Sequence, residues 1–166
     1  METGRPTIAA VDGAVRAGGI GLMASCDLVV VNSATTFALT EVRIGVAPAI
    51  ISVPILQRVP AGKIAAAMLT GEVFDAWEAR AIGLVTHVTD DVGTTVASLV
   101  EGVRAGAPRA VRETKALLHR VPTLTRAEAF AEMAALSNEL FAAPDAQLGM
   151  QAFRERRRPD WSRASP

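Results

Sequence analysis

Two adjacent glycines stand where an apolar, helix-like segment begins, in the stretch RAGGIGLMASCD (16–27). Gly18 and Gly19 would let the backbone come close to another group, and the first N–H groups of a helix have no partner within it. Such N–H groups can bind a phosphate, a carboxylate or an oxyanion. A tight turn or close helix packing would explain the same pair. The pair does not form a phosphate-binding P-loop, since no Gly-Lys-Ser/Thr follows it.

A single carboxylate, Glu41 in FALTEVRIG (37–45), is the second candidate for chemistry. It lies between a strand-like segment and an apolar segment, where a carboxylate can act as a general acid or base. The alternative is a surface carboxylate that pairs with Arg43. The two histidines, His87 and His119, form neither a metal-binding spacing nor a triad, so we expect no metal.

The elements that must position these residues follow from the hydrophobic pattern. Apolar, β-branched runs predict strands over 7–13 and 27–32, on either side of a helix over 18–26. This order is typical of an α/β unit. Further predicted elements are an edge strand over 33–39, a helix over 45–59 with a break or bend near Pro54, helices over 60–71 and 75–83, a strand over 84–88, and helices over 90–105, 108–120, 125–141 and 145–158.

The composition is that of a globular domain. The 166 residues are 50% hydrophobic and carry no net charge, which excludes a disordered chain and gives no electrostatic argument for nucleic acid. One cysteine cannot form an internal disulfide, so we expect a reducing, cytoplasmic location. No apolar run reaches the ~18 residues of a membrane span, and the first residues show no signal-peptide pattern.

Four segments, taken in order, resemble the enoyl-CoA hydratase/isomerase family, the crotonases. They are PTIAAVDGAVRAGGIGLMASCDLVVV (6–31), FALTEVRIGVAPAIISVPILQRV (37–59), LTGEVFDAWEARAIGLVTHV (69–88) and APDAQLGMQAFRERRRPDW (143–161). The resemblance implies an α/β fold, with a crotonase-like (ClpP/crotonase) spiral of β-β-α turns in 1–88 and a helical trimerisation region in 89–166. Compared with the family, the chain begins late. We therefore expect roughly the N-terminal third to be missing. In the family, this part supplies one of the two backbone N–H groups that bind the thioester oxygen in the oxyanion hole.

The resemblance also implies roles for individual residues. The family acts on acyl-CoA thioesters of fatty acid metabolism, so coenzyme A is part of the substrate and no cofactor is implied. Gly18, beside Gly19, matches the family's oxyanion-hole N–H donor, and Glu41 matches its proton-transfer residue. Phe153 and Arg157 match a helix near a neighbouring subunit's CoA site, in a homotrimer or hexamer. The alternative for this end is a solvated basic helix terminus with Phe153 in the trimer core.

Gly21 leaves the reaction open. Family hydratases usually carry a second glutamate three residues after the donor glycine, where this chain has Gly21. Hydration of a 2-enoyl-CoA by Glu41 alone is our first expectation, and a double-bond isomerase or another single-carboxylate crotonase is the alternative. A catalytically incompetent, truncated remnant is the third hypothesis. A spiral cut at its start would leave the strand edge at 7–11 unpaired, which predicts poor solubility or association.

Overall fold

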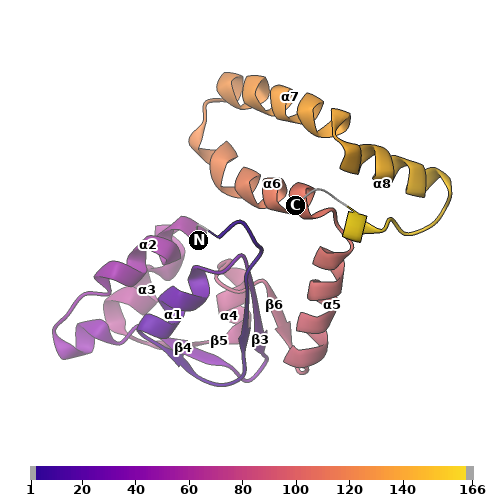
Figure 1. Ribbon diagram of the computed structural model, residues 1–166. Coiled ribbons are helices and arrows are strands. Elements are labelled where there is room, and N and C mark those ends of the chain that lie inside the picture. Colours follow the sequence, from indigo (N-terminus) through magenta and orange to yellow (C-terminus); the bar gives the residue numbers. More distant parts are fainter. Residues whose placement is uncertain (1–2, 164–166) are drawn as a thin grey trace. The chain divides into compact units, whose positions relative to one another are not determined.

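A computed structural model describes residues 3–163 of the chain (Figure 1). It divides into two compact units, which are described separately. The first unit is Thr7–Leu99, and the second combines residues 3–6 with the helical residues from 100 onward.

Two small sheets form the frame of the first unit. Its strands are β1 (Ile8–Val11), β2 (Val15–Arg16), β3 (Leu28–Asn32), β4 (Thr36–Ala38), β5 (Val73–Asp75) and β6 (His87–Thr89). One sheet has the parallel order β1-β3-β6, and the other has the order β2-β4-β5, with β5 antiparallel to β4. The chain passes from β1 to β2 and then into helix α1 (Gly18–Ala24), and from β3 to β4 before the next helices. This is the β-β-α order expected of the spiral.

The core of the first unit lies around β3 and β4. Val29, Val30 and Val31 of β3 are fully buried, and such burial contributes about 1.5–3 kcal/mol per side chain. Phe37 of β4 stacks on Phe74 of β5, with ring centroids 5.4 Å apart. Strand β1 pairs with β3 on one side and lies at the edge of its sheet. This position agrees with the expected open edge at 7–11.

Three helices and a short 3-10 helix complete the first unit. They are η1 (Glu41–Ile44), α2 (Ala49–Arg58), α3 (Ala61–Thr70) and α4 (Ala76–Ala81). Helix α4 begins with a capping box, in which Asp75 accepts from the Glu78 N–H and Glu78 accepts from the Asp75 N–H. Gly71 ends α3 with a φ of 68°. The start of α4 and the end of α3 are therefore fixed by residues typical of these positions.

Two predictions for this unit are wrong, one of them in part. Residues 33–39 do not form an edge strand, because β4 lies between β2 and β5 and its Phe37 is fully buried. The predicted break of helix α2 at Pro54 is absent, because the helix runs through it to Arg58, while the alternative of a bend there stays a prediction. The proline removes one backbone hydrogen bond, and burial of Ile55 in the core offsets this loss.

The second unit is helical. Its helices are α5 (Val92–Arg104), which begins in the first unit, α6 (Pro108–Arg120), α7 (Arg126–Ala142) and α8 (Pro144–Arg154), with 3-10 turns η2 (Val121–Thr123) and η3 (Trp161–Arg163). Ion pairs Arg109–Glu139 and Arg120–Glu132 join α6 to an antiparallel α7. Helix α8 ends at Arg154, before the predicted limit at 158. No helix in the described part of the chain is long and apolar enough to cross a membrane.

Candidate functional site

Two neighbouring parallel strands bring Gly18 and Glu41 to one edge of a sheet. Arg16, the last residue of β2, is in register with Ala38, the last residue of β4. The Ala17 N–H continues this pairing by donating to the Ala38 carbonyl at 3.1 Å. Gly18 begins α1 just beyond β2, and Glu41 begins η1 just beyond β4. The carboxyl ends of parallel strands are a common place for ligand sites.

The start of α1 is open to a ligand. Gly18 and Gly19 are exposed, and a Cβ atom added to Gly18 would meet nothing within 4 Å. The Ile20 N–H already donates to the Ala17 carbonyl at 2.9 Å. The first turn of α1 contains no acidic residue that would compete for its N–H groups. An incoming oxygen can therefore approach the backbone at Gly18.

Ala17 holds the entry to α1 in a strained conformation. Its φ of 47° and ψ of −121° lie in a region that suits glycine and that alanine rarely adopts. The hydrogen bond to Ala38 and the helix that follows fix this geometry. The strain sets the direction in which the Gly18 N–H points. The sequence does not indicate this strained conformation, because alanine is a common helix residue.

We expect Ala17→Gly to raise the free energy of unfolding by about 1 kcal/mol. Relief of the strain is worth about 1–3 kcal/mol, and the added freedom of the unfolded chain subtracts about 0.4–1 kcal/mol. Ala14 is the matched control, because it is exposed and is not among the residues with positive φ. In urea unfolding, Ala14→Gly should lower stability slightly. A loss at Ala17→Gly equal to that control would show that position 17 stores no strain.

Glu41 presents a carboxylate oxygen that has no hydrogen-bond partner among residues 3–163. The residue is half-buried, and its Oε2 atom is buried and accepts no hydrogen bond from the residues described. The backbone around it is fixed, since the Glu41 carbonyl accepts from the Val46 N–H at 3.1 Å. The Arg43 guanidinium, proposed as a surface partner, donates instead from Nε to the Thr70 carbonyl at 3.0 Å. A buried polar atom without a hydrogen-bond partner requires an explanation, and a ligand group that donates to it would provide one.

Phe153 and Arg157 belong to the second unit. Phe153 is 84% exposed on α8. Arg157 lies beyond the end of that helix, and its Nε atom lies 2.5 Å from Glu155 Oε2. Neither observation tests the predicted contact of these two side chains with CoA, so this contact stays a prediction.

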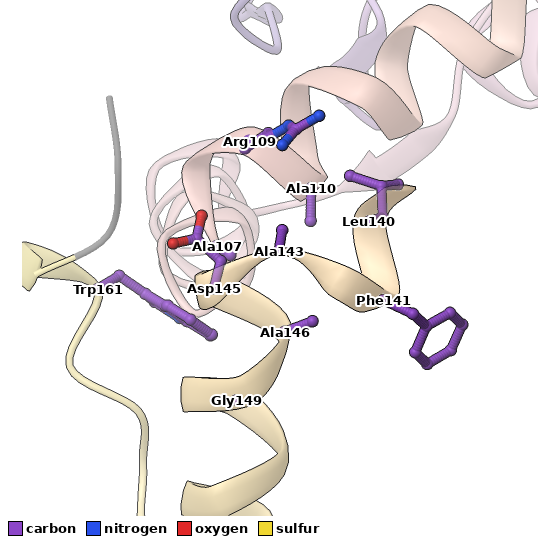
Figure 2. A pocket seen from close by; sticks show the side chains of 10 residues that line it. All are labelled: Ala107, Arg109, Ala110, Leu140, Phe141, Ala143, Asp145, Ala146, Gly149 and Trp161. Carbon is purple, nitrogen blue, oxygen red and sulfur yellow. The ribbon is translucent and has the colours of Figure 1, made fainter. Parts of the chain in front are cut away.

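A pocket of about 310 Å³ also lies in the second unit (Figure 2). Alanines and large apolar side chains of α6, α7 and α8 line it, together with Trp161. Figure 2 shows the Phe141 ring turned away from the other labelled side chains, and this residue is 65% exposed. Arg109 in its wall is already paired with Glu139. The candidate site is therefore the sheet edge with Gly18 and Glu41, not this pocket.

The match to a family of known proteins extends over almost the entire chain. The model of the family described as enoyl-CoA hydratase/isomerase matches residues 1–164. This chain belongs to that family. Its crotonase fold agrees with the β-β-α order above.

No group of three or more metal-ligating side chains is found among residues 3–163.

Individual relatives agree with the assignment. A Thermus thermophilus protein provisionally named an enoyl-CoA hydratase is 37% identical over 93% of this chain and 62% of its own length. Mevalonyl-coenzyme A hydratase sidH of Aspergillus fumigatus is 34% identical over 95% of this chain and 60% of its own length. The crystal structure of an enoyl-CoA hydratase from Mycobacterium tuberculosis superimposes with a TM-score of 0.87 at 31% identity, covering 95% of this chain and 64% of that one. The chain thus spans about 60% of the length of the relatives it matches.

Proposed function

We propose that this family member acts on the thioester of an acyl-CoA, with the Gly18 N–H as an oxyanion donor and Glu41 as the acid/base. One observation carries the proposal. The buried Glu41 Oε2 accepts no hydrogen bond from the described residues, and it belongs to a residue at the sheet edge where α1 begins. A carboxylate and a backbone N–H at one edge would supply a proton-transfer group and an oxyanion donor for enolate chemistry.

The proposed chemistry starts at the carbon next to the thioester carbonyl. Glu41 removes a proton from this carbon, and the electrons of the C–H bond move to the carbonyl oxygen. The Gly18 N–H donates to that oxygen, where negative charge develops. Gly19 lets α1 lie close to β2, because a Cβ atom built on it would lie 3.1 Å from Val15 Cγ1. Glu41 then returns its proton to carbon.

Two reactions of the family pass through this enolate. In hydration of a 2-enoyl-CoA no C–H bond breaks: Glu41 takes a proton from water as the water oxygen bonds to C3, the electrons of the C2=C3 bond move to the thioester oxygen, and Glu41 then gives the proton to C2. In double-bond isomerisation, the proton leaves C2 of a 3-enoyl-CoA and is returned to C4. We propose hydration as the activity and keep isomerisation as the alternative, because a single carboxylate can perform either. The CoA group is part of the substrate, and we propose no cofactor.

Turnover assays test this proposal directly. Hydration of crotonyl-CoA and isomerisation of a 3-enoyl-CoA are measured by absorbance with the purified chain. We expect turnover of at least one of the two substrates. Absence of both reactions in a folded sample would reject the activity and favour the hypothesis of an incompetent remnant.

The remaining proposals concern partners and location. Phe153 and Arg157 contact the CoA nucleotide of a neighbouring subunit by apolar packing and charge. The assembly is a homotrimer or hexamer, and the protein is cytoplasmic. Exposed apolar side chains support association, since Ile50, Leu69 and Phe130 are 88%, 75% and 68% exposed. Sedimentation as a stable monomer would count against the proposed assembly.

A further inference from the structure

Gly21 brings helices α1 and α2 into very close contact. A Cβ atom built on Gly21 would lie 2.5 Å from Ile51 Cγ2, 2.6 Å from Ile51 Cβ and 3.1 Å from Ile51 Cα. Gly21 is buried, and the two helices lie side by side (Figure 1). The obstruction includes the backbone of α2, so a rotation of the Ile51 side chain cannot remove it. The third glycine of RAGGIGL is therefore required by packing.

This contact bears on the site because of where Gly21 lies on α1. Residues three apart on a helix share a face, so position 21 is on the face of Gly18. Ile51 is the third residue of α2, and it packs against the core of the first unit. An apolar side chain therefore occupies the space beside the oxyanion donor that a side chain at position 21 would need.

We infer that Ile51 is a specificity-determining residue: it keeps a second carboxylate out of position 21 and leaves the reaction to Glu41. This inference rests on the proposed function. A hydration site that also holds and deprotonates water benefits from two carboxylates. With Ile51 in place, Glu41 has to serve the proposed hydration without a second carboxylate that would hold the water. Opening the contact should make room for a glutamate at position 21 and shift the reaction toward hydration.

The steric part of the inference is tested by urea unfolding of Gly21→Glu, Ile51→Gly and the double variant. Gly62→Glu is the matched control, because Gly62 is an exposed residue of α3 and its added Cβ would meet nothing within 4 Å. We expect Gly21→Glu to lower the urea midpoint and Gly62→Glu to leave it unchanged or higher. The double variant should lose less than the sum of the two single losses. Strictly additive losses, or a Gly21→Glu midpoint equal to that of Gly62→Glu, would overturn the inference.

The catalytic part is tested by the ratio of crotonyl-CoA hydration to 3-enoyl-CoA isomerisation in the same proteins. General acid/base groups contribute about 10²–10⁴-fold, so a rise in this ratio of at least about tenfold is expected in the double variant relative to Ile51→Gly. An unchanged ratio in a folded double variant would overturn the assignment of Ile51. Failure of every protein on both substrates would instead reject the proposed function, while the unfolding data would still decide whether Ile51 excludes the glutamate.

Discussion

Glu41→Gln is expected to lower the turnover of an acyl-CoA substrate by about 10²–10⁴-fold, the usual contribution of a general acid/base. The amide keeps the shape of the side chain but cannot take up a proton from carbon. Stability should not fall, because the Oε2 atom accepts no hydrogen bond within the described structure that the change would break. The rates of the variant and the parent chain are compared under saturating substrate.

Glu72→Gln is the matched control for this experiment, since Glu72 is an exposed carboxylate between α3 and β5. It should retain the parent rate. Full activity of Glu41→Gln would remove Glu41 from the mechanism. A loss of folding with Glu41→Gln would instead indicate a structural carboxylate, and urea unfolding separates these two outcomes.

Arg58→Ala is expected to lower the free energy of unfolding by about 3 kcal/mol, a value typical of lost hydrogen bonds to a charged group. Arg58 is the last residue of α2, and its guanidinium donates to carbonyls of four residues. The distances are 3.4 Å to Ala24, 2.5 Å to Cys26, 3.2 Å to Asp27 and 3.3 Å to Gly83. The side chain thereby ties α2 to the end of α1, the start of β3 and the turn after α4.

Burial lowers the pKa of Arg58, because removal from water disfavours the charged form, and the nearby Cys26 and Asp27 partly oppose this shift. The guanidinium stays charged at neutral pH, so its loss leaves several carbonyl oxygens without a strong donor. Arg58→Lys should recover only part of the stability, since an ammonium group lacks the planar fork.

Arg80→Ala is the control for Arg58, because Arg80 is exposed on α4 and its loss should change stability by no more than about 0.5 kcal/mol. Urea unfolding is followed by circular dichroism, and hydrogen exchange at the β3 amides reports on the first unit alone. Equal effects of the Arg58 and Arg80 substitutions would contradict the role given to Arg58.

Much of the fold could be predicted because its signals are local. Asp75 and Glu78 form a capping box within one turn, and Gly71 ends a helix through its own backbone conformation. The apolar run of β3 marks a fully buried strand by composition alone. The strand 36–38 was placed wrongly because its position in the sheet depends on β5, which is distant in the sequence.

The candidate site was predictable only in part. The family resemblance named Gly18 and Glu41, and the register of β2 and β4 explains why they reach one edge. The positive φ of Ala17 and the contact of Gly21 with Ile51 arise from tertiary packing. No local sequence pattern predicts such packing. From the sequence, Gly21 could be interpreted only as the position at which the family's second glutamate is absent. The structure adds a steric reason for the glycine.

The central claim is that Glu41 moves a proton at the carbon next to a thioester carbonyl held by the Gly18 N–H. Exchange of the C2 protons of butyryl-CoA in D₂O, followed by NMR, measures this step without requiring either hydration or isomerisation. The account predicts exchange with the parent chain and a rate at least about 10²-fold lower with Glu41→Gln. No exchange with the folded parent chain, or equal exchange with both proteins, would contradict it.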